Sequence, residues 1–390
     1  MFSSRLDWNL TPNRLAALIE AKRQAGAPVL DLTESNPTRA GLQYPGAAIL
    51  EALADARSLV YEPRAAGAWE ARSAISAFYA ERGVEVPPER VLLTASTSES
   101  YSFLFKLLAD PGDEVLTPRP SYPLFEFLAA LESVRAIPYP LAYHGRWSVD
   151  FDALAHTVTP RTRAIVVVNP NNPTGSFLKR DELARLTALA AERKLAIVSD
   201  EVFADYTFRP DPARVSTLVG GGDALVFSLN GLSKFAGLPQ MKLGWIAMSG
   251  VAGEVARARE RLELIADTYL SVGTPAQHAL PRLLDLGRDV GGRIAARVRG
   301  NFETLGEALR SAPACAMLDV EGGWYATLRV PRTHSEEEWT LVLLERDNVL
   351  VQPGFFYDFE TEAFLILSLL TPPEVFREGV GRLLARIEAV

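Results

Sequence analysis

The 390-residue sequence contains few of the residues that mark several classes of protein. Its one cysteine, Cys315, excludes an intrachain disulfide and favours a reducing compartment. The four histidines lack the spacing of metal ligands, so no metal site is expected. No apolar run is long enough to span a bilayer, and the first residues lack the core of a signal peptide. We therefore expect a cytoplasmic protein.

Positive charge is also scarce. Lysine and arginine together number 40 against 48 acidic residues, which gives a net charge of -8. This balance offers no electrostatic basis for binding nucleic acid or an anionic membrane. With 48% hydrophobic and 23% charged residues, the composition is that of a globular protein with a large core and more than one domain.

Short apolar runs alternate with helical patterns through the middle of the chain. The strand candidates are residues 91–93, 114–117, 164–168, 196–199, 224–228 and 243–248. Several are apolar on both faces, which is typical of buried parallel strands, and amphipathic helices such as 180–193 lie between them. This alternation predicts a doubly wound α/β sheet that binds ligands at the carboxyl ends of its strands.

Both ends of the chain have a different pattern. Thr11-Pro12 as a cap and Gly26 as a stop predict a helix over 12–25. Near Gly291-Gly292 the pattern changes to a long helix, which precedes short strands and a closing helix; these elements are expected at residues 325–330, 349–351, 364–368 and 373–389. We interpret residues 41–289 as a large α/β domain, and residues 1–40 with 290–390 as a smaller α+β domain.

One lysine follows a strand in a setting that suggests reactivity. Lys234 ends the run Ser228-Leu-Asn-Gly-Leu-Ser-Lys234, and Lys242 comes soon after it. Burial and a neighbouring positive charge both disfavour an ammonium group, so the free amine can form a Schiff base with a carbonyl compound. Because most lysines are solvated at the surface, this motif needs support from the rest of the chain.

Two polar residues upstream provide that support. Asp200 ends the apolar run 195–199; it is either a cap or ion-pair partner, or an acid that keeps a pyridine nitrogen protonated so that the ring can withdraw electrons. Asn172 lies in the loop Asn169-Pro-Asn-Asn-Pro-Thr-Gly175, which is either an ordinary turn or a place where the amide bonds a phenolate oxygen. Together with Lys234, the two residues predict a pyridoxal phosphate site.

Other residues match the remaining parts of that cofactor. The segment Ser96-Thr97-Ser98 leads into a helix, where hydroxyls and free amides can hold a phosphate together with Ser233 and Lys242. Simple N-capping explains this segment equally well. Tyr122 follows another strand and either packs in the core or stacks on the cofactor ring.

With these motifs the chain resembles the class I/II aminotransferases, which are fold-type I pyridoxal phosphate enzymes, over nearly its whole length. The most specific elements are Asn171-Asn-Pro-Thr-Gly175, Asp200-Glu201 and Asn230-Gly-Leu-Ser-Lys234, in order and at family-like spacing. The resemblance implies a large domain with a mostly parallel seven-stranded sheet and a smaller α+β domain. It implies transfer of an amino group from an amino acid or amine to an oxo acid, in a homodimer with shared active sites.

The resemblance also assigns roles to single residues. Lys234 would carry the Schiff base, Asp200 would pair with the ring nitrogen, and Asn172 would contact the 3-hydroxyl. Tyr122 would stack on the ring. The phosphate would be held by Ser96-Thr97-Ser98, Ser233, Lys242 and, from a neighbouring subunit, Tyr61.

The chain departs from the family at several cofactor-binding positions. Phe203 stands where many members have a tyrosine that donates to the 3-hydroxyl, so that hydrogen bond should be missing. Gly231 replaces a common phosphate-binding serine, and Ser96 occupies a position that is often glycine. Lys242 replaces the usual arginine, so a point charge would take the place of a bidentate fork.

The largest departure concerns the substrate. Members of the family place an arginine in the segment matching Phe364-Leu-Ile366-Leu-Ser368 to clamp the α-carboxylate, and here Ile366 stands in its place. One hypothesis is that Arg39 replaces the clamp, with Ser35, Asn36 and Trp324 nearby; a surface arginine is the equal alternative. Otherwise the substrate is an amine, or backbone amides hold its carboxylate.

The motifs leave other functions open. A carbon-sulfur β-lyase or a decarboxylase would share every cofactor residue, and only a requirement for an oxo acid acceptor separates these enzymes from a transaminase. A non-catalytic regulatory protein that binds pyridoxal phosphate is a further alternative. Such proteins usually carry an N-terminal DNA-binding module, whereas here the α/β pattern starts within the first tens of residues.

Overall fold

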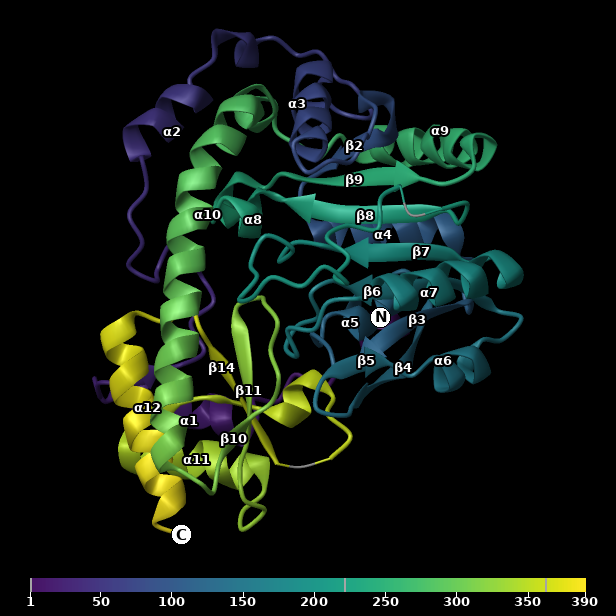
Figure 1. Cartoon of the computed structure of the whole chain (residues 1–390). Coiled ribbons are helices and arrows are strands. Elements are labelled where there is room, and N and C mark those ends of the chain that lie inside the picture. Colours follow the sequence, from purple (N-terminus) through teal and green to yellow (C-terminus); the bar gives the residue numbers. More distant parts are fainter. Residues whose placement is uncertain (1, 221, 362) are drawn as a thin grey trace.

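The computed structural model describes residues 2–220, 222–361 and 363–390, and its largest element is an eight-stranded sheet (Figure 1). The strand order is β2-β9-β8-β7-β6-β3-β4-β5. The strands are β2 (Val91–Thr94), β3 (Glu114–Arg119), β4 (Arg135–Tyr143), β5 (Trp147–Val149), β6 (Thr162–Val168), β7 (Ala196–Asp200), β8 (Val226–Gly231) and β9 (Gly244–Ser249). From β8 through β4 neighbouring strands are parallel, while β9 and β5 are antiparallel to their neighbours.

The six predicted strands are confirmed, but the expected number of seven strands is wrong. The eighth strand is β5, three residues long, which pairs antiparallel with the edge strand β4. A tight turn reverses the chain between them: Gly145 has φ +79°, and the His144 amide donates to the Arg146 carbonyl at 3.0 Å. This hairpin is too short to leave a clear alternating pattern in the sequence.

Helices cover both faces of the sheet, as expected for a doubly wound fold (Figure 1). Strand β6 shows why, because Ala164 and Val166 belong to one apolar core and Ile165 and Val167 to another. The first core includes α4 (Thr97–Leu108), α5 (Phe125–Leu131) and α9 (Ala252–Tyr269). The second includes α6 (Phe151–Thr157) and α7 (Arg180–Arg193). Side chains that alternate along a strand thus anchor two layers of helices.

A single long helix, α10 (Thr274–Ala308), runs down one side of the molecule in Figure 1. The expectation that a helix starts after Gly291-Gly292 is therefore wrong, since the helix begins at Thr274 and continues through these glycines. Close packing explains the glycine at 291, where a Cβ would lie 2.8 Å from the carbonyl oxygen of Phe235. Phe235 belongs to α8 (Leu232–Phe235), the short helix that carries Lys234. Gly291 therefore permits a helix contact beside the predicted site.

The C-terminal part forms a second, four-stranded antiparallel sheet of order β10-β11-β14-β13. Its strands are β10 (Ala316–Met317), β11 (Tyr325–Arg329), β13 (Gln352–Pro353) and β14 (Phe364–Ser368). The N-terminal segment joins this region, because β1 (Leu30–Asp31) pairs in parallel with β12 (Val349–Leu350). The division at residues 40/41 and 289/290 remains a prediction, and α10 passes through the second of these points without a break.

The remaining helices are short or lie around these sheets. They are α1 (Arg14–Gln24), α2 (Gly46–Leu53), α3 (Trp69–Ala80), α11 (Glu336–Asp347) and α12 (Pro373–Glu388), with 3-10 turns at Ser4–Leu6, Ala56–Leu59, Pro88–Arg90, Pro239–Met241, Leu309–Ser311 and Gly354–Tyr357. The predicted cap of the first helix is wrong: Asn13 caps it, and its side chain accepts from the Ala16 amide at 2.8 Å. Among the described residues, no helix is long and apolar enough to cross a membrane.

Candidate active site

The register of the large sheet brings the predicted phosphate-binding residues to one edge. Thr94 at the end of β2 pairs with Gly244, and Gly244 pairs with Gly231 at the end of β8. The Ser96-Thr97-Ser98 turn follows β2, Ser233 follows β8, and Lys242 precedes β9, which runs in the opposite direction. All three groups therefore leave the sheet at the same edge, although they are far apart in the sequence.

The helix N-terminus at this edge is well formed. Ser96 caps α4, and its hydroxyl accepts from the Glu99 amide at 3.2 Å, so the N-capping alternative is realised. Capping by Ser96 leaves the amides and hydroxyls of Thr97 and Ser98 to bind an anion. Lys242 is exposed, and its backbone has a positive φ of +51°.

Gly231 has a steric reason for being glycine. A Cβ at this position would lie 2.8 Å from the Gly244 Cα and 2.9 Å from the Leu243 carbonyl oxygen. A serine here would therefore collide with the backbone of β9. The close approach of two strands therefore favours glycine at this position.

Asp200 and Asn172 come from the neighbouring strands β7 and β6. Asp200 ends β7, and its carbonyl accepts from the Asn169 amide at 2.8 Å, which ties the loop carrying Asn172 to the end of β7. The Asn172 side chain is only 8% exposed, and its Oδ1 atom has no hydrogen-bond partner among the described residues. A half-turn of the amide exchanges its two ends, so this position can present either an acceptor or an N–H donor to a ligand.

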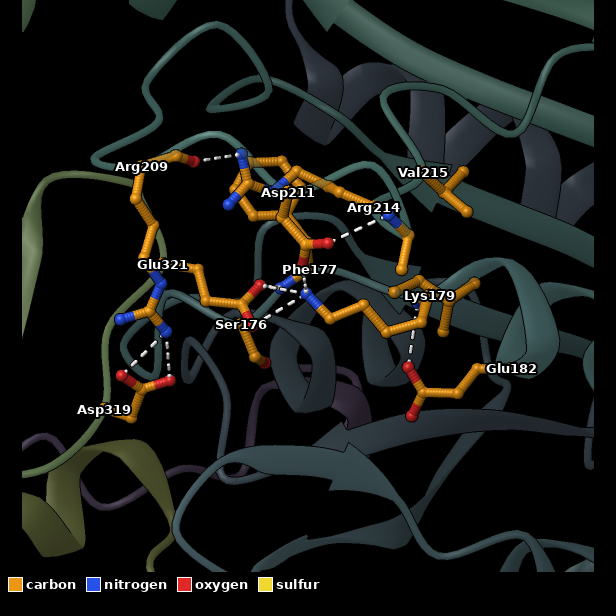
Figure 2. Close-up of polar contacts among 12 residues, drawn as sticks. Ser176, Phe177, Lys179, Glu182, Arg209, Asp211, Arg214, Val215, Asp319 and Glu321 are labelled. Carbon is orange, nitrogen blue, oxygen red and sulfur yellow. Dashed lines mark hydrogen bonds and ion pairs between the residues drawn. The ribbon is translucent and has the colours of Figure 1, made fainter.

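A cluster of charges follows the loop that carries Asn172: Lys179 points toward Asp211 and toward Glu321, which lies between strands β10 and β11 (Figure 2). The Lys179 ammonium group lies 2.7 Å from both carboxylate oxygens of Glu321 and 2.7 Å from Oδ2 of Asp211. Glu321 also accepts from the Phe177 amide at 3.2 Å. Its own amide donates to the Gly175 carbonyl at 3.2 Å. The chain on both sides of this contact is thereby fixed: the Asn172 loop on one side and Trp324 on the other.

Lys234 lies among aromatic rings. Its Nζ atom is 5.0 Å from the ring centroid of Trp324 and 5.5 Å from that of Phe203. Tyr206 donates to the Lys234 carbonyl at 2.6 Å and so holds the backbone of α8. Burial lowers the pKa of Lys234 to about 8, and the charge of Asp200 opposes this shift. Lys242, the neighbouring cation expected to help, is not among the causes of the lowered pKa of Lys234, so that part of the expectation is wrong.

Asp200 is shifted in the opposite direction. Burial raises the pKa of its carboxyl group to about 6, against the hydrogen bonds it accepts and the charge of Lys234. The Val202 amide donates to Oδ1 and the Tyr101 hydroxyl donates to Oδ2, each at 3.2 Å. The site thus combines a buried amine of low proton affinity with an acid held by two neutral donors.

The structure places the other predicted residues with different degrees of exposure. Tyr122 is 47% exposed and Tyr61 is 79% exposed. Trp324 is fully buried beside Lys234, whereas Arg39 is exposed and Ser35 and Asn36 are partly buried. Ile366 is 1% exposed and pairs with Thr327 and Gln352, so its side chain is packed within the second sheet. Among the described residues, no group of three or more His, Cys, Asp or Glu could hold a metal ion.

Sequence reasoning missed two residues that support the site, Tyr101 and Tyr206. Tyr101 lies on α4, 99 residues before the Asp200 that it contacts. Tyr206 lies 28 residues before the Lys234 carbonyl to which it donates. A local sequence pattern cannot predict contacts between residues so far apart in the chain, and in the sequence both tyrosines resemble ordinary core aromatics.

The fold and these residues define a class of enzyme. Over residues 27–383 the chain matches the family described as Aminotransferase class I and II, and it belongs to that family. The relatives and solved structures support pyridoxal phosphate-dependent transamination as the activity of this chain.

Among its relatives is the glutamate-pyruvate aminotransferase AlaA of Escherichia coli K12, which is 28% identical over 94% of this chain and 93% of the relative. Alanine aminotransferase of Mycobacterium tuberculosis H37Rv is 28% identical over 91% of this chain and 84% of its own length. The solved alanine aminotransferase from Pyrococcus furiosus superimposes with a TM-score of 0.90 and 25% identity, and the whole of both chains is covered.

Proposed function

We propose that this aminotransferase binds pyridoxal 5′-phosphate through Lys234, Asp200 and Asn172. The observation that supports the proposal is that Asp200 ends β7, while Lys234 and Asn172 come after the adjacent strands β8 and β6, so all three lie toward the same edge of the sheet. The residues fit the cofactor: the buried amine of Lys234 would hold its aldehyde, the Asp200 carboxylate would pair with its ring nitrogen, and the buried Asn172 amide would bond its 3-hydroxyl. When bound, the cofactor supplies an electron sink for the bond to the substrate's α-carbon.

Each of the three side chains then has a defined task. With its pKa near 8, Lys234 is partly neutral at physiological pH and can hold the cofactor covalently. When it is not bound to the cofactor, the Nζ atom of Lys234 would be the base that takes the proton from the substrate's α-carbon. Asp200 keeps the ring nitrogen protonated and Asn172 orients the 3-hydroxyl. Phe203 offers that hydroxyl no hydrogen bond.

The phosphate and ring contacts are part of the same proposal. Ser96, Thr97 and Ser98 at the N-terminus of α4 would hold the phosphate with Ser233 and Lys242. Tyr122 would stack on the ring. Tyr61 would reach the phosphate of a second subunit in a homodimer, which accords with its 79% exposure in the single chain.

We also propose a cytoplasmic location, in accord with the single, buried cysteine.

The donor is an amino acid or an amine and the acceptor is an oxo acid. The relatives are named for glutamate, alanine and pyruvate, so these compounds are the first to test. Ile366 stands where the resemblance places a carboxylate-binding arginine. Our candidate to bind the substrate instead is Arg39, together with Ser35, Asn36 and Trp324. Replacement Arg39→Gln should raise the Michaelis constant for every amino acid that carries an α-carboxylate, and unchanged constants would exclude this role.

The function is tested by the dependence on an acceptor. The holoenzyme is mixed with one candidate donor at a time, and conversion of the cofactor to its amine form is followed by absorbance. We expect one stoichiometric conversion without an oxo acid and continuous turnover with one. Failure of all α-amino acids, with success of simple amines, would assign an amine donor.

A lyase remains the alternative because one relative carries that name. The S-alkyl-thiohydroximate lyase SUR1 of Arabidopsis thaliana is 30% identical over 61% of this chain and 52% of its own length. Release of pyruvate and ammonia from a sulfur-containing amino acid, without any acceptor, would favour this function over transamination.

A further inference from the structure

Asp200 has a partner that the motifs do not predict. The hydroxyl of Tyr101 donates to Oδ2 of Asp200 at 3.2 Å, from the second turn of α4. We propose that Tyr101 is a positioning residue that keeps Asp200 ionised and aimed at the ring nitrogen, so that one helix fixes both the phosphate end and the ring-nitrogen end of the cofactor. This inference rests on the pyridoxal phosphate site proposed above.

The surroundings of Tyr101 leave its ring little freedom. The side chain is 3% exposed and its ring centroid lies 5.3 Å from that of Phe125, nearly perpendicular, and 5.9 Å from that of Phe105. On the other side of the carboxylate, the Val202 amide donates to Oδ1 at 3.2 Å. One rigid donor on each oxygen therefore fixes the plane of the Asp200 carboxylate.

The direction of the hydrogen bond follows from the state of both groups. Burial raises the pKa of Tyr101 well above its ordinary value, so the phenol keeps its proton and acts as the donor. A donated hydrogen bond favours the ionised form of Asp200, whereas burial alone favours the neutral form. The ionised carboxylate accepts much more strongly than the neutral acid from a protonated ring nitrogen, because the two groups then carry opposite charges. Tyr101 thus offsets part of the cost of burying the acid.

The same helix also presents the predicted phosphate site. Ser96 caps α4, and Tyr101 follows five positions later, a rise of about 7.5 Å along a helix. The N-terminal amides of α4 and the Tyr101 hydroxyl therefore have a fixed separation. Helix α4 can thus act on both ends of the cofactor, directly at the phosphate and through Asp200 at the ring nitrogen.

The test compares two cofactors on three proteins. Apo forms of the wild type, Tyr101→Phe and Tyr139→Phe are titrated with pyridoxal 5′-phosphate and with its 1-deaza analogue, in which a C–H group replaces the ring nitrogen. Tyr139 is a matched control because it is buried and its hydroxyl donates to the Val166 carbonyl at 2.8 Å, not to Asp200. Far-UV circular dichroism verifies that each variant is folded.

We expect Tyr101→Phe to weaken binding of pyridoxal phosphate relative to the analogue by about 10-fold or more, as for a lost hydrogen bond to a charged group. Tyr139→Phe should leave the ratio of the two dissociation constants, for pyridoxal phosphate and for the analogue, unchanged. Equal weakening of both ligands by Tyr101→Phe would show a merely structural role and overturn the inference, as would no change. If the wild type itself binds no pyridoxal phosphate, the proposed function fails instead.

A double-mutant cycle gives an independent readout. In the Asp200→Asn background no carboxylate remains for the phenol to keep ionised, so adding Tyr101→Phe should not change the ratio further. The same ratio change in both backgrounds would mean that Tyr101 acts by another route and would contradict the inference.

Discussion

At the scale of the residue, burial sets the proton affinities of Lys234 and Asp200, and the attraction between the two groups limits both shifts. Burial moves the pKa of Lys234 down to about 8 and that of Asp200 up to about 6, and the attraction between the two charges opposes both shifts. The lysine is therefore a far better nucleophile at neutral pH than a solvated lysine, while most of the acid remains ionised. These are the states that binding of an aldehyde and a protonated pyridine requires.

The reactivity of Lys234 in the apo-protein should therefore rise with pH and reach half its maximum near pH 8. The change Asp200→Asn removes the charge that favours the ammonium form, so this midpoint should move to lower pH. The midpoint is measured by modifying the apo-protein with an amine-reactive reagent over a range of pH and following the Lys234 peptide by mass spectrometry. Asp205→Asn, at an exposed aspartate, is the control. A midpoint near that of free lysine would contradict the assignment of a buried, reactive amine.

The central residues of the proposed site could be picked out from the sequence because each lies at or just after the end of an apolar strand. Lys234, Asp200 and Asn172 could be assigned because turns at strand ends are local patterns. The Tyr101 contact could not be predicted, since it depends on how α4 lies against β7. The helix start expected after Gly291 was wrong for a similar reason, because glycine at this position permits the close approach of two segments that are distant in the sequence.

At the scale of elements, the site depends on loops held by a buried ionic cluster. The cluster joins Lys179, at the start of α7, to Glu321, in the segment between β10 and β11. Lys179 is 3% exposed and Glu321 is 5% exposed. Removing one charge from such a pair leaves the other buried without compensation, which costs far more than losing a surface pair.

Lys179→Met should accordingly lower the free energy of unfolding by about 3–5 kcal/mol. The double variant Lys179→Met/Glu321→Gln should recover much of this loss, because no buried charge of Glu321 remains and the Phe177 amide keeps an acceptor. The control is Arg209→Met in the more exposed Arg209–Asp319 pair (Figure 2), where we expect a change of at most about 1 kcal/mol. Urea unfolding measures all three, and equal losses for Lys179→Met and Arg209→Met would refute this account of the cluster.

At the scale of the whole molecule, strand-helix alternation was enough to predict the α/β sheet and the second α+β region. The sequence could not show that α10 is continuous, because glycines that serve packing look like glycines that end helices. Nor could it show which surface meets another subunit. The structure exposes the apolar residues Leu59, two positions before Tyr61, and Leu264, which are 89% and 71% exposed.

A homodimer should bury this surface. We expect sedimentation velocity to show a dimer for the wild type, and Leu59→Lys or Leu264→Lys to weaken it and to speed loss of the cofactor, since Tyr61 would no longer reach the second site. Val390→Lys, at an exposed apolar residue at the end of the chain, is the control. A wild-type monomer that retains the cofactor would contradict shared active sites.

The most direct test of the central claim is to locate the covalent link to the cofactor. The purified holoenzyme is treated with borohydride, which reduces a carbon–nitrogen double bond to a stable amine, and is then digested and mapped by mass spectrometry. The account predicts a phosphopyridoxyl group on Lys234 and none on the same peptide from Lys234→Ala. A phosphopyridoxyl group on another lysine, or none on the reduced wild-type protein, would contradict it.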